Sequence, residues 1–204
     1  MSERIYHPPS VKGTSTPDVV VSHREGSDFS LLKQRRFLRN GDSYIGRGPG
    51  LAVFVDGCCL DNGTPNARAG MGVYFGPGSP HNISRPLGGN GPKTNQRAEI
   101  RAAVLALGKV YRLLRFGDLC TSHLAIISDS AHVVNSMTKW VEKWRNNGYI
   151  SARGERVVNA RDLMELDGIT RNLEDMGVAV RFWRVDREYN GEADELARDG
   201  ARCA

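Results

Sequence analysis

Acidic side chains stand where apolar segments of this chain end or where helical patterns begin. Asp56 and Asp129 each close a predominantly apolar run, and Glu99 and Asp194 fall near the starts of helical patterns. A charge beside an apolar strand is costly to desolvate unless it is paired, and converging acids usually bind a cation. The four carboxylates are therefore candidate ligands of a metal ion that prefers oxygen.

Predicted strands and helices explain how acids that are far apart in the sequence could meet. Glycine-rich turns separate three strands of an antiparallel meander, at residues 51–56, 69–75 and 82–87. Helices and strands then alternate: a helix at 95–114, a strand at 124–129, helices at 131–145 and 162–176, a strand at 178–185 and a helix from residue 192. This order predicts an α/β fold with a five-stranded mixed sheet, three antiparallel strands followed by two parallel strands, and helices on both faces.

The predicted fold brings the acids to one edge of the sheet. Ligand sites in such sheets lie at the carboxyl ends of parallel strands, where Asp56 and Asp129 fall. Glu99 shares a helical face with alanines one and two turns later, and we expect that face to turn toward the sheet. An acid in a first helical turn also stabilises its helix through the helix dipole, so Glu99 or Asp194 alone has an equally good structural explanation.

Length and composition indicate one ordinary domain preceded by a separate segment. The chain has 204 residues, of which 40% are hydrophobic and 25% charged, and its net charge of +5 favours a polyanionic partner. We expect residues 1–48 to be a flexible tail or linker, with a short basic helix at 29–38 as an alternative, and residues 49–204 to form the domain. With no bilayer-length apolar run and no secretory signal, we expect an intracellular protein without a membrane partner.

Four short segments resemble the signature blocks of type 1 ribonuclease H, particularly of its eukaryotic and bacterial branch. They are Asp56-Gly57-Cys58-Cys59, Thr94-Asn95-Gln96-Arg97-Ala98-Glu99, Ser128-Asp129-Ser130 and Glu192-Ala193-Asp194-Glu195-Leu196-Ala197, and the resemblance covers residues 51–202. It implies a ribonuclease H-like fold and a catalytic domain at residues 49–204. It also implies endonucleolytic hydrolysis of the RNA strand of RNA:DNA hybrids, with 5′-phosphate and 3′-hydroxyl products.

The resemblance also gives roles to the four acids. Asp56, Glu99, Asp129 and Asp194 match the catalytic, metal-binding carboxylates of the family. Hard oxygen ligands suit Mg²⁺, for which Mn²⁺ can substitute. Two such ions about 3.5–4 Å apart can clamp an in-line phosphoryl displacement. No small-molecule cofactor is expected, and the resemblance implies a monomer.

Residues beside the acids match family positions that read the RNA strand. A protein distinguishes RNA from DNA by contact with the 2′-hydroxyl. The matching RNA-binding candidates are Cys59, through its backbone, and the side chains of Asn62, Asn95 and Gln96. Asn62 equally suits an ordinary turn, and Asn95 equally suits a helix cap.

The DNA strand is expected to meet residues 138–149, where cations alternate with aromatic rings. Trp140 and Trp144 lie one helical turn apart, so we expect one to be mainly buried and the other to line a DNA channel. Thr94 and Asn159 match positions of a family pocket that binds a DNA phosphate. The usual arginine of that pocket is missing here, and Lys93 is the candidate substitute. The DNA-binding candidates are Lys93, Thr94, Trp140, Lys143, Trp144 and Asn159.

The chain departs from the family pattern between its last strand and its last helix. Many members carry a glycine-rich loop with a histidine there, whereas residues 184–191 are shorter and contain no histidine. Arg187 and Glu188 are candidate replacements. This departure keeps open a hybrid-binding module of the same fold with reduced or lost turnover. Because related folds cut DNA junctions, a nuclease that acts on DNA is a third alternative.

Overall fold

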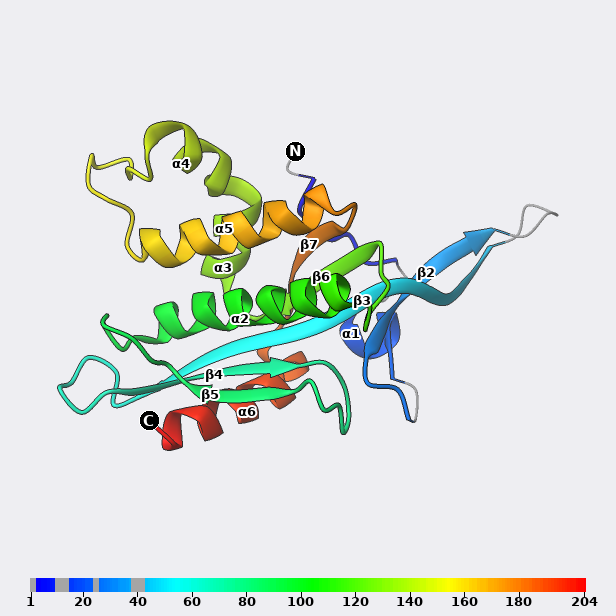
Figure 1. Ribbon diagram of the computed structural model, residues 1–204, viewed down its shortest axis with the longest axis horizontal. Coiled ribbons are helices and arrows are strands. Elements are labelled where there is room, and N and C mark those ends of the chain that lie inside the picture. Colours follow the sequence, from blue (N-terminus) through cyan, green and yellow to red (C-terminus); the bar gives the residue numbers. More distant parts are fainter. Residues whose placement is uncertain (1–2, 10–14, 24–25, 38–42) are drawn as a thin grey trace.

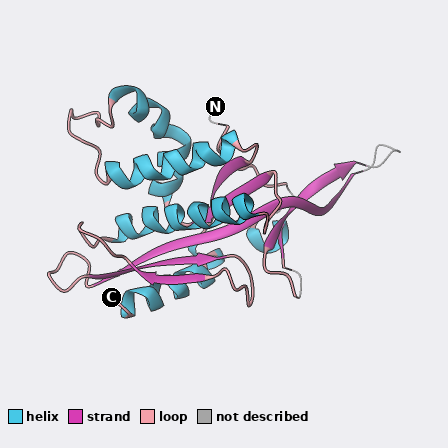
Figure 2. Ribbon diagram, viewed as in Figure 1, coloured by secondary structure: helices cyan, strands magenta, loops and turns pink. Residues whose placement is uncertain are grey.

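The computed structural model describes residues 3–9, 15–23, 26–37 and 43–204, and it shows a mixed sheet with helices on both faces (Figures 1 and 2). The strands of its seven-stranded sheet are β1 (Val21–Ser22), β2 (Ser30–Phe37), β3 (Ser43–Leu60), β4 (Arg68–Tyr74), β5 (Ile83–Pro86), β6 (His123–Ser128) and β7 (Ala179–Arg184). The helical elements are α1 (Pro17–Val20), α2 (Asn95–Phe116), α3 (Ala131–Asn135), the π-helical turn η1 (Ser136–Trp140), α4 (Val141–Asn147), α5 (Ala160–Asp175), the 3-10 turn η2 (Arg187–Tyr189) and α6 (Gly191–Arg202).

The long strand β3 is the centre of the sheet. Along one edge it pairs antiparallel with β2 and then with β4, and along the other it pairs parallel with β6. Because β6 in turn pairs parallel with β7, these three strands point their carboxyl ends the same way. The predicted α/β fold is confirmed, and the sheet contains β1 and β2 in addition to the five predicted strands.

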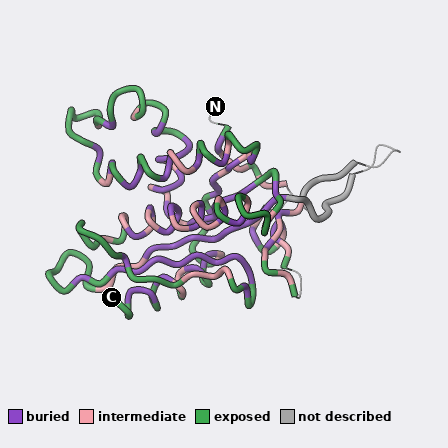
Figure 3. The backbone as a smooth tube through the Cα atoms, viewed as in Figure 1, coloured by how far each residue is buried: buried purple, intermediate pink, exposed green. Residues whose placement is uncertain are grey.

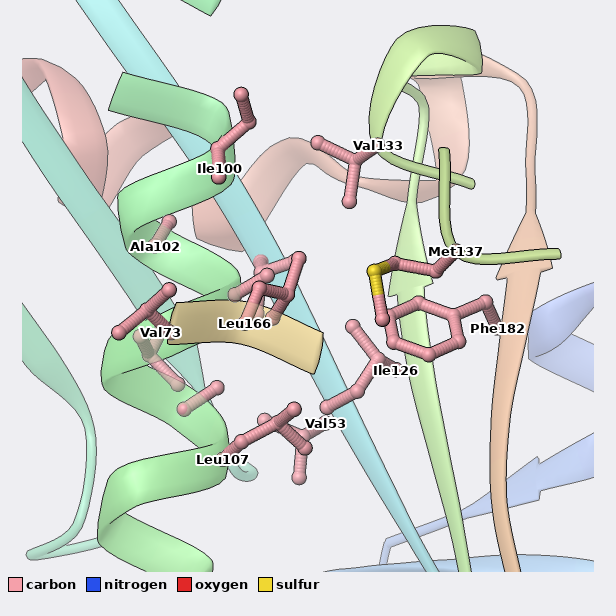
Figure 4. Packing of buried hydrophobic residues seen from close by; sticks show 14 of the residues in the cluster. Val53, Val73, Ile100, Ala102, Leu107, Ile126, Val133, Met137, Leu166 and Phe182 are labelled. Carbon is pink, nitrogen blue, oxygen red and sulfur yellow. The ribbon is translucent and has the colours of Figure 1, made fainter. Parts of the chain in front are cut away.

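Alternate residues of β3 supply the cores on the two faces of the sheet, as the two-residue period of a strand requires. Leu51, Val53 and Val55 belong to the larger core, which α2 and α5 cover, whereas Ala52 and Phe54 belong to the smaller core on the face of α1 and α6. Figure 3 shows how continuously the central strands are buried. Figure 4 shows the larger core, in which Ile100 and Leu107 of α2 and Leu166 of α5 pack against the sheet residues Val53 and Ile126.

The helix α2, with 22 residues, lies across the larger core and has clear signals at both ends. At its start the Thr94 hydroxyl accepts a hydrogen bond from the Arg97 amide, and at its end Gly117 adopts a left-handed conformation with φ of +81°. Its buried face is rich in alanine, which lets the helix lie close to the sheet. Of the helices in the described parts of the chain, none is both long enough and apolar enough to cross a membrane.

Part of the segment expected to be a tail or linker belongs to the sheet. The strand β2 pairs with β3, and Leu32 is only 2% exposed. The alternative of a short basic helix at 29–38 is wrong over residues 30–37, because their backbone pairs with β3; residue 38 lies outside the described residues. Near the other edge, Ile5 forms a parallel bridge with Phe182 of β7. Pairing with β3, the next strand along the chain, has overridden the local composition of residues 30–37.

The continuous helix predicted at 131–145 is divided into α3, η1 and α4. The Thr138 hydroxyl donates to the Val134 carbonyl at 2.7 Å, within the region where the backbone widens into the π-helical turn. Such side-chain bonds to the preceding turn bend helices, and π-helical turns are often found at functional sites. The break changes the direction of the chain just before α4.

Candidate active site

Asp56 lies near the carboxyl end of β3 and is almost fully enclosed, with 5% of its surface exposed. Its Oδ1 accepts a hydrogen bond of 2.8 Å from the Gly57 amide. Burial raises the pKa of the Asp56 carboxyl from 3.8 to about 8, and the negative charge of Asp129 adds to this shift. Because burial and a neighbouring negative charge disfavour the ionised form, the Asp56 carboxyl either keeps its proton or binds a cation.

Glu99 reaches the same place from the fifth position of α2, just beyond the first turn of the helix, which contains no acid. Its Oε2 accepts from the Ser130 hydroxyl at 2.6 Å, and its Oε1 accepts from the Asn95 amide group at 2.9 Å. Burial raises the pKa of the Glu99 carboxyl, while the bond from Ser130 opposes that shift. The two hydrogen bonds fix both carboxylate oxygens, so the side chain is oriented before any ligand binds.

The close approach of α2 to β3 depends on Gly57. A Cβ atom at this position would lie 2.1 Å from the Glu99 backbone nitrogen and 2.2 Å from the Ala98 carbonyl carbon. No side chain fits in that space, so the residue after Asp56 has to be glycine for Glu99 to come this near. The sequence block that contains Asp56 therefore positions two acids.

Asp129 follows β6 and is held by Asn190, a residue that the sequence interpretation missed. Asn190 is 1% exposed, and its Nδ2 donates to the Val55 carbonyl at 3.1 Å and to Asp129 Oδ1 at 3.2 Å. Its own Oδ1 has no hydrogen-bond partner among the described residues. The available signal was a polar residue directly before the helix that carries Asp194, which also suits an ordinary helix start.

Asp194 lies in the first turn of α6, where two arginines pair with it. Arg187 Nη2 lies 3.4 Å from Asp194 Oδ1, and Arg198 Nε lies 2.9 Å from Oδ2. The Asp194 side chain is 20% exposed, the Arg187 side chain 72%. Glu188, the other candidate replacement for the family histidine, is exposed in η2 and does not line the acidic cavity.

The four predicted acids open onto one cavity of about 280 Å³. Its lining is Asp56, Gly57, Cys58, Leu60, Asn95, Glu99, Asp129, Arg187, Asp194, Arg198 and Arg202. In the described part of the chain, no three His, Cys, Asp or Glu side chains are close enough to hold a metal ion in this conformation. The donor set nevertheless fits a hard cation, because its acids supply only oxygen and their mutual repulsion contributes to the raised pKa of Asp56.

The predicted RNA-binding residues border the acidic cavity. A neighbouring cavity of about 460 Å³ is lined by Asn62, Pro92, Thr94, Asn95, Gln96, Glu99, His132, Val158 and Asn159. Asn95 belongs to both cavities: its Nδ2 donates to Glu99, and its Oδ1 accepts from the Cys59 amide at 3.1 Å. The Cys59 N–H is therefore already used within the protein. Asn159 Nδ2 donates to Gln96 Oε1 at 3.1 Å, which fixes the orientation of that amide.

The predicted DNA-binding residues fall into two groups. Thr94 and Asn159 line the second cavity, and the exposed Lys93 lies beside Thr94. Trp140, Lys143 and Trp144 belong to η1 and α4. Trp140 is 38% exposed, whereas Trp144 is partly buried against the larger core, and their ring centroids are 5.5 Å apart. Trp140 is thus exposed and Trp144 half-buried, and their contact with DNA stays a prediction.

Together, the sheet order and the acids at the ends of parallel strands define an α/β protein with the ribonuclease H fold, which solved structures share. The PFV RNase H domain is 22% identical with a TM-score of 0.56, covering 74% of this chain and 94% of that domain. LC9-RNase H1, a type 1 RNase H with the type 2 active-site motif, is 25% identical with a TM-score of 0.52, covering 76% of this chain and 73% of that one.

This chain belongs to the ribonuclease H family, because residues 49–202 match the family model described as RNase H. Ribonuclease H1 of Mus musculus is 38% identical over 165 residues, covering 79% of this chain and 53% of the mouse protein. Ribonuclease H of Anaplasma marginale is 32% identical over 150 residues, covering 72% of this chain and 88% of that protein. The chain spans about half the length of its mammalian relatives, at 53%.

Proposed function

We propose that this chain is a metal-dependent endoribonuclease that hydrolyses the RNA strand of RNA:DNA hybrids and leaves 5′-phosphate and 3′-hydroxyl ends. The observation that carries the proposal is the convergence of Asp56, Glu99, Asp129 and Asp194 on one cavity, with the pKa of Asp56 raised to about 8. Acids that destabilise one another in this way are expected where a cation binds. Family membership supports the same activity.

In this proposal the four carboxylates hold two Mg²⁺ ions, for which Mn²⁺ can substitute. When bound, such ions supply an activated water and stabilise the charge on the leaving oxygen. The protein's own part is orientation: Ser130 and Asn95 fix Glu99, and Asn190 fixes Asp129. The ion pairs of Asp194 with Arg187 and Arg198 have to open for this acid to act as a ligand.

We propose that the cavity beside the acids selects the RNA strand. Asn62, Asn95 and Gln96 line the cavity beside Glu99 and carry amide groups of the kind that recognise a 2′-hydroxyl, and Cys59 supports them by donating its backbone N–H to Asn95. The DNA strand would contact Lys93, Thr94, Trp140, Lys143, Trp144 and Asn159, whose charges and ring faces suit phosphates and sugars. The net charge of +5 agrees with a polyanionic substrate.

The test is a cleavage and binding assay of Asp129→Asn in Mg²⁺, with RNA:DNA hybrid, duplex RNA, single-stranded RNA and duplex DNA. The change removes a ligand charge but keeps an oxygen that can still accept from Asn190. We expect hybrid binding within about threefold of wild type and hybrid cleavage lowered by about 100-fold or more, the cost of disturbing a metal site. Asp186→Asn, the same change at an exposed aspartate outside the cavity, is the control.

If the wild type binds hybrid without cleaving it, the result would favour the hybrid-binding module. If it cleaves duplex DNA, the result would favour a nuclease that acts on DNA. Normal cleavage by Asp129→Asn would refute the assignment of the acids.

A Mg²⁺ titration in the same assay compares Arg187→Ala with Glu188→Ala. Because Arg187 pairs with Asp194, we expect only its removal to shift the Mg²⁺ dependence.

A further inference from the structure

A fully buried carboxylate, Asp167, lies in the middle of α5 and joins three arginines. Asp167 is 1% exposed. Arg4 Nη1 lies 2.8 Å from its Oδ1, while Arg145 Nε lies 3.0 Å and Arg171 Nε 3.4 Å from its Oδ2. A buried acid needs such partners, because an unpaired buried charge is strongly destabilising. The three arginines come from three places: the start of the chain, α4 and α5 itself.

The backbone around Arg4 is fixed by the sheet. The Phe182 amide of β7 donates to the Arg4 carbonyl at 2.7 Å, and the Tyr6 amide donates to the Phe182 carbonyl at 3.0 Å. The Arg4 guanidinium then reaches α5, where it also donates to both carboxylate oxygens of Glu174 at 2.9 and 2.7 Å. Arg4 therefore connects the edge of the sheet to α5 through a planar, two-pronged contact.

The partner on the other carboxylate oxygen, Arg145, belongs to α4, which also carries Lys143 and Trp144. Figure 1 shows α4 standing beyond α5, at the outside of the molecule. Arg4 and Arg145 both line a cavity of about 660 Å³ between the start of the chain and α4. Because Arg4 and Arg145 both form ion pairs with Asp167, this carboxylate connects the start of the chain to α4 across the cavity.

We propose that Asp167 is a positioning residue for nucleic-acid binding: it holds α4, and with it Trp144 and Lys143, in place for the DNA strand, and Arg4 completes this link. The inference rests on the proposed function, because it assumes that α4 meets the DNA strand. It gives Arg145 a structural task. With its Nε bound to Asp167, Arg145 orients α4, and the neutralisation of phosphate falls to other cations of the segment.

The experiment compares Arg4→Ala and Arg145→Ala with Arg171→Ala in the full chain. Arg171 is the matched control, because it also pairs with Asp167 but lies on the same helix and, among the described residues, forms no ion pair with a second element. Amide hydrogen exchange over residues 141–147 reports on α4 without nucleic acid. Hybrid affinity is measured at several salt concentrations, and kcat and KM are measured separately.

We expect Arg4→Ala to speed exchange in α4 and to raise KM about fivefold or more at unchanged kcat, and Arg171→Ala to do neither. If Arg145 only positions α4, Arg145→Ala leaves the slope of log Kd against log salt unchanged. If Arg145 instead neutralises a phosphate, the same change lowers that slope by about 1. Unchanged exchange and KM in Arg4→Ala, or a lowered slope in Arg145→Ala, would overturn the inference.

Two further arms keep the result interpretable. If Arg4→Ala does not fold, Arg4→Lys keeps the charge and removes the two-pronged geometry, and it should show the same changes to a smaller degree. If the wild type neither binds nor cleaves hybrid, the proposed function fails on its own. Hydrogen exchange in α4 then still decides whether Arg4 holds that helix.

Discussion

At the level of single residues, Asp56 is the only one of the four acids in the cavity that is buried, whereas Glu99, Asp129 and Asp194 are partly exposed. Asp56 is 5% exposed and faces Asp129, so burial and then charge repulsion raise its pKa to about 8. In the protein without metal, this carboxyl holds its proton through most of the neutral range. A cation in the cavity would favour the ionised form and reverse the shift.

The raised pKa predicts an unusual pH dependence of stability in the presence of a chelator. Between pH 3.8 and about 8 the folded protein binds a proton at Asp56 that the unfolded chain has released. The contribution of Asp56 is therefore complete below this window and is lost as pH rises through it, by up to about 1.4 kcal/mol per pH unit. Urea unfolding at several pH values should show this decline, and Asp56→Asn should remove it. Parallel pH profiles for the two proteins would contradict the prediction.

The four acids could be predicted because each sits at the boundary of an apolar or helical pattern. Two of their partners, Asn190 and Arg198, could not. Asn190 reaches the Val55 carbonyl across 135 positions of the sequence, and Arg198 looks like any exposed helical cation until α6 lies beside the cavity. A sequence pattern carries the spacing within an element, whereas these contacts exist only after two distant elements meet.

At the level of elements, close packing of helices on the sheet sets the geometry of the site. On one face Gly57 lets α2 touch β3, and on the other Gly70 and Gly72 let α6 lie against β4, where added Cβ atoms would come within 2.1 Å of helix backbone. Helix existence was predicted well because the apolar period is local. The division of residues 131–147 into three helical pieces was not predicted, because it depends on Thr138 and on packing.

Gly57→Ala is expected to destabilise the protein by about 3 kcal/mol or more, since its methyl group overlaps the backbone of α2 and overpacking is costly. Cleavage should fall as well, because α2 carries Glu99 away from Asp56. Gly108→Ala in the same helix meets nothing within 4 Å and should stabilise by about 0.5–1 kcal/mol. Thermal unfolding of both variants checks the pair; similar effects at the two glycines would show that close packing at Gly57 is not the cause.

At the level of the whole molecule, the sheet extends beyond the region that matches the family. The match begins at residue 49, yet β2 pairs with β3, and Val20, Val21 and Leu32 are buried in the smaller core. Mixed charge and scattered prolines in residues 1–48 favoured a linker, and the pairing that overrides them involves a strand whose continuation lies inside the domain. We propose that β1 and β2 fold as part of the catalytic domain.

Leu32→Ala tests this extent of the folded unit. If β2 is an integral strand, loss of a side chain that is 2% exposed should cost about 2–4 kcal/mol in chemical denaturation. Leu31→Ala, at the half-buried neighbouring position, is the control and should cost clearly less. A cost below about 0.5 kcal/mol for Leu32→Ala would mean that residues 1–48 behave as a tail after all.

The bridge between Ile5 and Phe182 bears on how copies of this chain meet in solution. An open strand edge is a template for pairing with another molecule. Here the start of the chain lies against β7, and on the opposite side β5 is four residues long and ends in a proline, which cannot donate a hydrogen bond. The β5 and β7 edges of the sheet are thus poor places for a second copy to add a strand, which agrees with the monomer that the family resemblance implies.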